Sequence, residues 1–286
     1  MGAIEYHMKR LLAAIAAVFL LSACSAAPAQ SGGVAATTGP VAQFARAIAA
    51  GTEVEVSQVI TDSVSCLHDY SLSVRQMETV EKSRAVLISG AGLEDFMSDA
   101  LAAAGTTVDC SSGIALRQLE GEDDPHIWLD PNRAAQMAEN LCAGLTALYP
   151  QHEQTFRANA DQLKERLAEL EAYGREALSG LQCRKLITFH DGFGYLAEAF
   201  DLEILAAVEE EAGSEASAAD LTEIIALVRE NRLPAVFVEA NGSVGAASVI
   251  RAETGVSVGV LDMAMGGSDY FEAMKANIDT LKEALQ

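Results

Sequence analysis

Three of the five histidines in this 286-residue chain stand at places where a metal ion could be held. His68, His126 and His190 each lie at or after the carboxyl end of an expected strand, or just before an expected helix. In open α/β sheets ligands bind at that edge, and neutral imidazole is a ligand that suits zinc. The three histidines are therefore candidate zinc ligands, although a single histidine in a loop is more often only hydrogen-bonded.

The elements that position these residues are predicted from short apolar runs, helical periodicity and breakers. The expected strands are 54–60, 85–90, 106–109, 185–189, 235–239 and 256–261, and the expected helices are 93–104, 132–148, 151–178, 194–200, 219–231, 244–254 and 270–285. Strands that alternate with helices predict an α/β fold with parallel β-sheets flanked by helices.

The longest helical pattern lies in the middle of the chain, over residues 151–178. Its apolar residues recur at spacings of four, three, four and three: Phe156, Ala160, Leu163, Leu167 and Leu170. This spacing is typical of an amphipathic helix, which would be about 42 Å long at 1.5 Å per residue. One such helix between two strand–helix alternations predicts two lobes joined by a long backbone helix.

The N-terminus has the features of an export signal. Lys9 and Arg10 precede an apolar run over 11–21, and Leu21-Ser22-Ala23-Cys24 follows. This ending resembles a bacterial lipobox, so we expect lipidation of Cys24 and attachment to the extracytoplasmic face of the cell membrane through lipid alone. The alternative is an ordinary signal peptide with an incidental cysteine. The predicted division is a signal peptide (1–23), a flexible tether (24–40), an N-terminal lobe (41–150), a linking helix (151–180) and a C-terminal lobe (181–286).

Four further cysteines would reach an oxidising compartment after export. They are widely spaced, without a C-x-x-C pair, so a zinc ribbon is not indicated. We expect two disulfides, Cys66–Cys110 and Cys142–Cys183. Residues 66–68 also allow an alternative, in which the thiol of Cys66 and the imidazole of His68 bind metal together.

The charge balance excludes one class of function. The chain has 41 acidic residues against 19 lysines and arginines, a formal net charge of -22. A surface this acidic repels phosphate backbones, so nucleic-acid binding is not expected. We expect a soluble monomeric domain behind the lipid anchor.

The motifs around these histidines, taken together, resemble the zinc/manganese-binding lipoproteins that serve bacterial metal ABC transporters. The matching stretches are His68–Leu72, Ile88–Glu94, Asp124–Pro131, Thr188–Tyr195 and Tyr270–Asn277, and the resemblance extends from about Gly39 to Gln286. The block Asp-Pro-His-Ile-Trp-Leu-Asp-Pro is the most specific of them.

The resemblance implies a metal bound in the cleft between the two lobes. Its implied ligands are His68, His126, His190 and Asp262, and Glu239 is the alternative fourth ligand. It also implies that Asp124 and Asp130 order the loop around His126 instead of binding metal.

One departure from the family concerns the segment before the second ligand. Zinc-specific relatives often carry a histidine-rich acidic loop there, whereas residues 117–123 are acidic but contain no histidine. Three nitrogen donors with one carboxylate still favour zinc over manganese, which prefers oxygen ligands.

The resemblance implies a binding protein that captures a divalent metal outside the membrane and delivers it to an ABC permease. The enzymatic alternative is an exported zinc hydrolase, which needs an open coordination position for water and a general base such as Glu239 or Asp191. The third alternative is a metal-binding surface adhesin.

Overall fold

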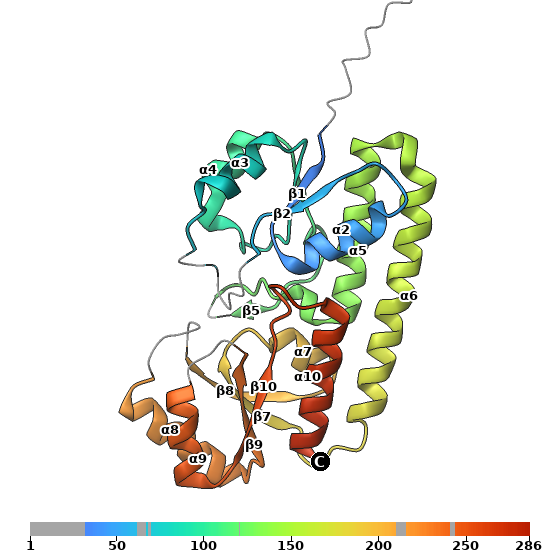
Figure 1. The fold of residues 1–286 in the computed structure, drawn as a ribbon. Coiled ribbons are helices and arrows are strands. Elements are labelled where there is room, and N and C mark those ends of the chain that lie inside the picture. The colour runs from blue at the N-terminus through green and yellow to red at the C-terminus, as the bar shows by residue number, and fades with distance from the viewer. Residues whose placement is uncertain (1–31, 62–66, 68–69, 120, 210–215, 241–243) are drawn as a thin grey trace, which may run out of the picture. The chain divides into compact units, whose positions relative to one another are not determined.

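The computed structural model describes residues 32–61, 67, 70–119, 121–209, 216–240 and 244–286, and these contain two four-stranded parallel sheets (Figure 1). The first sheet has the order β2-β1-β3-β4 and is formed by β1 (Val34–Ala36), β2 (Val56–Gln58), β3 (Val86–Ile88) and β4 (Thr107–Asp109). The second has the order β10-β9-β7-β8 and is formed by β7 (Lys185–His190), β8 (Glu203–Glu209), β9 (Ala235–Glu239) and β10 (Ser257–Leu261). The predicted fold class, two lobes of parallel sheet flanked by helices, is confirmed.

Helices surround both sheets, and a short antiparallel hairpin, β5 (Gln118–Leu119) and β6 (Glu122–Asp123), precedes the middle helices. The helices of the first half are α2 (Gly39–Ala49), α3 (Val74–Lys82), α4 (Ser98–Ala104) and α5 (Pro131–Leu148), with 3-10 turns η1 (Asp95–Met97), η2 (Ile127–Leu129) and η3 (Pro150–His152). Those of the second half are α7 (Gly194–Ala199), α8 (Ala218–Asn231), α9 (Val244–Thr254) and α10 (Tyr270–Leu285). Helices α8 and α9 cover one face of the second sheet, where a separate apolar cluster is buried.

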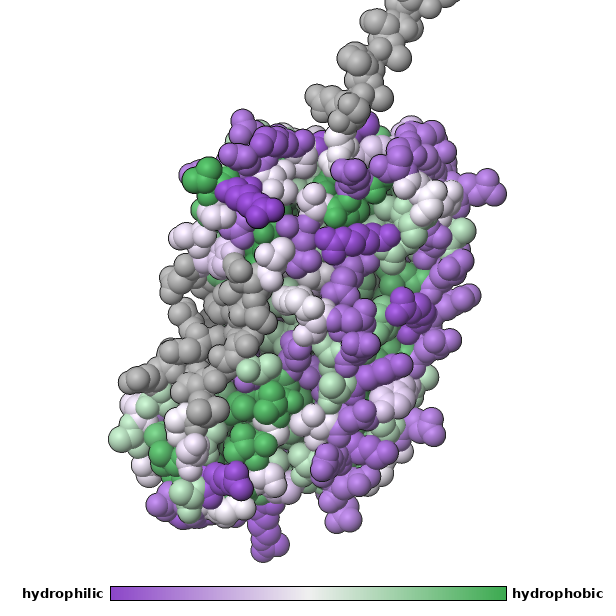
Figure 2. All heavy atoms as spheres, in the orientation of Figure 1, coloured by the Kyte–Doolittle hydropathy of each residue, from purple (hydrophilic) through white to green (hydrophobic). Residues whose placement is uncertain are grey.

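The predicted long helix is present as α6 (Glu153–Leu178). All five apolar residues that defined its pattern are buried, and the helix packs against α2 and α5 of the first half and α10 of the second. Its other side faces solvent, and hydrophilic side chains gather along it in Figure 2. The helix therefore links the two lobes through a shared apolar face.

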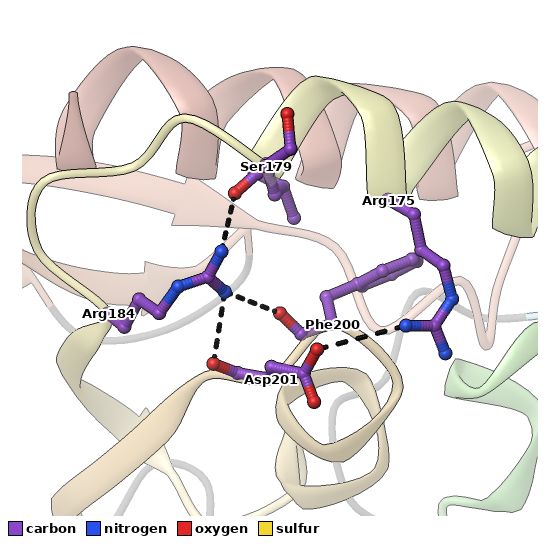
Figure 3. Close-up of a pocket in the computed structure, with 6 residues that line it drawn as sticks. Arg175, Ser179, Arg184, Phe200 and Asp201 are labelled. Atoms are coloured by element: carbon purple, nitrogen blue, oxygen red, sulfur yellow. Dashed lines mark hydrogen bonds and ion pairs between the residues drawn. The ribbon is translucent and has the colours of Figure 1, made fainter.

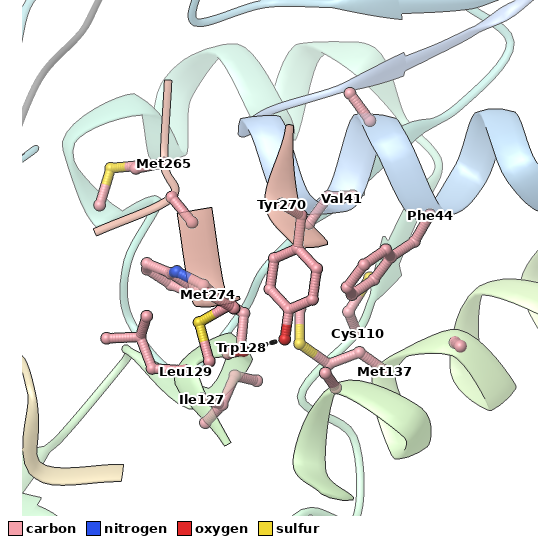
Figure 4. Packing of buried hydrophobic residues seen from close by; sticks show 14 of the residues in the cluster. Val41, Phe44, Cys110, Ile127, Trp128, Leu129, Met137, Met265, Tyr270 and Met274 are labelled. Carbon is pink, nitrogen blue, oxygen red and sulfur yellow. Dashed lines mark hydrogen bonds between the residues drawn. The ribbon is translucent and has the colours of Figure 1, made fainter. Parts of the chain in front are cut away.

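Apolar side chains from both halves meet in one core (Figure 4). The indole of Trp128 is fully buried, and its Nε1 donates to the carbonyl oxygen of Met263 at 2.7 Å. The hydroxyl of Tyr270 donates to the carbonyl oxygen of Trp128 at 2.7 Å, and its ring packs nearly perpendicular to that of Phe44, with the ring centroids 4.9 Å apart. A Cβ on Gly39 would lie only 2.7 Å from the carbonyl oxygen of Met265, so the backbones of the two halves approach as closely as glycine allows.

The predicted tether of residues 24–40 extends too far. Val34, Ala35 and Ala36 form β1, which is at most 1% exposed and pairs with both β2 and β3, and α2 begins at Gly39. Small side chains suit this closely packed strand, but they are also the composition of a flexible linker. The signal segment and Cys24 lie outside the described residues. No described helix is both long enough and apolar enough to cross a bilayer.

The predicted Cys142–Cys183 disulfide is wrong, and the structure does not show the Cys66–Cys110 disulfide. Cys110, Cys142 and Cys183 are free thiols, and Cys66 lies outside the described residues. Burial raises the pKa of Cys142 on α5, and the charge of Asp161 also raises it. Cys142 therefore lies near the first half of α6, which contains Asp161. Cys183 follows the far end of α6, so the two thiols are separated by about 25 Å of helix, whereas a disulfide requires Cα atoms within about 7 Å. Cys110 is fully buried in the core.

Candidate metal site

His126 lies in the loop between the β5–β6 hairpin and η2, and a neighbouring carboxylate fixes its ring. Oδ1 of Asp124 accepts the backbone N–H of His126 at 3.0 Å and lies 2.9 Å from its Nδ1. A carboxylate at Nδ1 holds the proton on that nitrogen, which leaves the Nε2 lone pair available to a metal. Asp130 caps α5 by accepting the N–H of Asn132. Asp124 thus orders the loop around His126, and Asp130 fixes the start of α5.

His190 ends β7, and the parallel pairing of strands places a carboxylate beside it. Thr188 is in register with Phe237 of β9, so His190 and Glu239 end adjacent strands at the same edge of the sheet. Both side chains are buried, and Nε2 of His190 lies 4.0 Å from Oε1 of Glu239. Gly192 is required here, because a Cβ at that position would lie 2.8 Å from Nε2 of His190.

The two predicted histidine ligands, 64 residues apart in sequence, meet in space. Their Nε2 atoms are 3.5 Å apart and their rings stand nearly perpendicular, with centroids 5.3 Å apart. One comes from the loop before α5 and the other from the second sheet, so both lobes contribute a nitrogen to the same buried point.

Asp262 occupies a different position from Glu239. It follows β10, where Asn277 of α10 donates to its carbonyl oxygen and accepts its N–H, both at 2.7 Å. Its carboxylate accepts the N–H of Ala264 at 2.8 Å and the hydroxyl of Ser268 at 2.9 Å. These bonds orient the carboxylate within its own loop, and Glu239 is the carboxylate that the structure brings next to His190.

The remaining predicted ligand, His68, lies outside the described residues. Within the described ranges, no three histidine, cysteine, aspartate or glutamate side chains already surround one point. The described residues therefore form a pair of imidazoles with a carboxylate close by.

Sequence reasoning missed residues that support the candidate ligands. Asn277 lies in the matching stretch Tyr270–Asn277, so its position was visible but its bonds to Asp262 were not. Gly192 lies in the matching stretch Thr188–Tyr195, but its close approach to the ring of His190 was not predictable from the sequence. Tyr195 and Glu198 of α7 contact residues near His126, and no sequence signal links segments so far apart.

A cavity of about 200 Å³ lies elsewhere, at the C-terminal end of α6 (Figure 3). Arg184 donates there to the carbonyl oxygens of Leu178, Phe200 and Asp201 at 3.1–3.2 Å. Arg184 precedes β7 while His190 ends it, so the cavity lies about 20 Å from the histidine pair. The guanidinium of Arg184 joins the end of α6 to the turn at residues 200–201. The residues that line the cavity therefore hold two elements of the fold together.

Comparison with known proteins bears on this site. Residues 34–284 match the family described as ZnuA, zinc-uptake complex component A, periplasmic. Zinc-binding lipoprotein AdcA of Streptococcus pneumoniae (strain ATCC BAA-255 / R6) is 27% identical over 302 residues, which cover 96% of this chain and 60% of AdcA. The chain thus spans about three fifths of that relative.

Solved structures show the same fold. The periplasmic zinc-binding protein TroA from Treponema pallidum has a TM-score of 0.80 at 27% identity and covers 89% of this chain and 99% of its own. The Zn(II)-bound ZnuA-like domain of Streptococcus pneumoniae AdcA has a TM-score of 0.78 at 26% identity, covering 89% and 98%. The laminin-binding protein of Streptococcus agalactiae, at 24% identity and a TM-score of 0.80 over 90% of this chain and 100% of its own, shares the fold alone.

Proposed function

The chain belongs to the ZnuA family of zinc-uptake components, and from this premise we propose that it captures zinc outside the cytoplasm and delivers it to an ABC permease. Zinc is its cargo, and binding is its function; no hydrolytic step is proposed. The low-identity laminin-binding structures do not support an adhesin.

The observation that carries the proposal is the distance between the two imidazole nitrogens. A tetrahedral zinc with Zn–N bonds of 2.0–2.1 Å separates its nitrogen ligands by about 3.4 Å. The Nε2 atoms of His126 and His190 are 3.5 Å apart, which is longer than an ordinary hydrogen bond between nitrogens. The pair is therefore spaced as two ligands of one ion.

We propose His68 as the third ligand and a carboxylate as the fourth. Asp262 has the position that the family resemblance indicates. Glu239 lies next to one of the histidines, with its Oε1 4.0 Å from Nε2 of His190. Two or three nitrogens with one carboxylate favour zinc over manganese.

The proposed location is the outer face of the cell membrane. The streptococcal relative is named a lipoprotein, and Leu21-Ser22-Ala23-Cys24 supplies a lipidation site in this chain. Cys24 is proposed as the lipidated N-terminal residue of a monomer that docks on its cognate permease. Mass analysis of the mature N-terminal peptide checks this, and an unmodified Cys24 would contradict it.

Zinc titration of purified variants tests the proposed function. We expect wild-type protein to bind one zinc tightly, and His126→Ala and His190→Ala to lose at least 100-fold in affinity, because each removes a ligand while the core of each lobe remains. His152→Ala is the matched control, since His152 pairs with Glu53 on the exposed surface. Wild-type affinity in a folded His126→Ala or His190→Ala protein would refute the site.

The same titration assigns the carboxylate. Asp262→Ala and Glu239→Ala are compared, and the true ligand is the one whose removal weakens zinc binding to a similar extent as loss of a histidine. If both variants bind as tightly as wild type, the fourth donor is not a carboxylate of this pair.

A further inference from the structure

Helix α7 begins at Gly194, four residues after His190, so its position is tied to the end of β7. Two of its side chains, Tyr195 and Glu198, are three residues apart and so lie on the same face of the helix. Both reach the segment of the first half that carries His126.

Tyr195 holds the base of the β5–β6 hairpin through its hydroxyl group. The hydroxyl accepts the backbone N–H of Arg117 at 2.9 Å and donates to the carbonyl oxygen of Asp124 at 2.9 Å. The N–H of Asp124 in turn donates to the carbonyl oxygen of Arg117, which closes the hairpin. Tyr195 is fully buried, and its bond to Asp124 is buried with it.

Glu198 binds two arginines of the same region. It accepts from Nη1 of Arg117 at 3.1 Å and from Nη2 of Arg133 at 3.0 Å. The hydrogen bond from Arg133 is the main cause that lowers the pKa of Glu198 below its usual value. Glu198 is therefore a carboxylate at neutral pH, although its side chain is 45% exposed and its ion pairs are partly screened.

These contacts extend to the imidazole of His126, the proposed zinc ligand. Nε of Arg117 lies 3.7 Å from Oδ2 of Asp124, and the other oxygen of Asp124 fixes Nδ1 of His126. His126 is thus held by a hairpin base that α7 grips, and His190 precedes the same helix. Helix α7 therefore links His126 to His190, the two residues whose Nε2 atoms are spaced as zinc ligands.

We propose that Tyr195 and Glu198 are positioning residues that set the His126–His190 spacing by holding the Arg117–Asp124 base of the hairpin against α7. This inference rests on the proposed zinc site and assigns to α7 the role of keeping that site assembled between lobes. Tyr195 is the principal member because it is buried and makes two bonds, whereas Glu198 is half-exposed.

Tyr195→Phe tests the inference, because it removes both hydrogen bonds and keeps the ring. Loss of a group that orients a metal ligand typically costs 10–100-fold in metal affinity. We expect zinc affinity to fall by that factor, mainly through faster release to a chelator. Tyr149→Phe is the matched control, since its hydroxyl donates to the carbonyl oxygen of Gly32. It should lose comparable stability to denaturant and keep wild-type affinity and release.

Two further variants separate positioning from general destabilisation. Glu198→Gln should weaken zinc binding several-fold in a fully folded protein, and high salt should reduce the difference from wild type. In a His126→Ala background, Tyr195→Phe should cause no further loss of affinity, because it acts through His126.

The outcomes distinguish this inference from the proposed function. Wild-type affinity and release in Tyr195→Phe, or a full additional loss in the His126→Ala background, would overturn the positioning role and leave the zinc site standing. Absence of zinc binding by the wild type would overturn both.

Discussion

Glu94 shows how strongly a single buried group can affect this protein. Its carboxylate accepts the N–H groups of Ser89 and Gly90 at 2.8 and 3.0 Å and the hydroxyl of Thr37 at 2.6 Å. These bonds join the carboxyl ends of β1 and β3. Burial outweighs them and raises the pKa of Glu94 to about 7, from a usual value of 4.5.

The raised pKa predicts how stability depends on pH. Between pH 4.5 and 7 the folded protein binds more protons than the unfolded chain, so this group makes stability fall as pH rises through that window. From pH 5 to pH 8 the contribution is about 2–3 kcal/mol. The test is denaturant titration of the zinc-free protein at pH 5 and at pH 8. Between these two pH values the free energy of unfolding should fall by about 2–3 kcal/mol less in Glu94→Gln than in wild type.

The control for that comparison is Glu169→Gln on the exposed side of α6. It should follow the wild-type pH dependence. Parallel curves for wild type and Glu94→Gln would show that Glu94 does not titrate in this range.

At the same scale, part of the site could be predicted from the residues alone. His126 and His190 stood out by side-chain type and by their place at strand ends. The proximity of Glu239 to His190 depends on the pairing of β7 with β9, which the sequence does not specify. The bond between Arg117 and Glu198 joins residues 81 apart, and neither residue lies in a recognisable pattern.

At the scale of elements, α6 depends on one small residue where it meets the second half. A Cβ on Gly174 would lie 2.3 Å from the ring of Phe200 and 3.1 Å from Cδ1 of Ile278. Glycine here permits close contact of α6 with α10 and with the end of α7, at the expense of helix propensity.

Gly174→Ala should therefore destabilise the fold by about 1–2 kcal/mol, the balance between an overpacking cost of about 1–3 kcal/mol and a gain of up to about 1 kcal/mol in helix propensity. Gly180→Ala is the control, because a Cβ there meets nothing within 4 Å. Urea denaturation measures both. A Gly174→Ala protein as stable as wild type would mean that Phe200 moves aside without cost.

Elements were predictable where one face is buried along a regular helix or strand. The spacing in α6 predicted its end at Leu178, and its start differs by two residues because a 3-10 turn precedes it. Helix α3 was missed because it is short and only Val80 of its apolar residues is buried. Two sequence signals for it were present, the three-residue spacing of Val74, Met77 and Val80 and the capping box of Ser73 and Gln76. Strand β8 was missed because it is an alanine-containing edge strand bounded by glutamates.

At the scale of the whole molecule, the two halves are joined by more than α6. Trp128 bonds to Met263, Gly39 bonds to Met265, and Gln43 accepts the N–H of Tyr270 at 2.9 Å. We therefore expect zinc release to involve loops and small lobe movements. The sequence indicated two lobes, but it did not show that Phe44 and Tyr270 share one core, because that contact spans most of the chain.

The most direct test of the central claim is a crystal structure of the zinc-loaded protein with the ion located by anomalous scattering. We expect one zinc ion within about 2.1 Å of Nε2 of both His126 and His190, with the bond from Trp128 to Met263 retained. A zinc ion bound elsewhere, for example between His152 and Glu53, or bound by only one of the two histidines, would contradict the account.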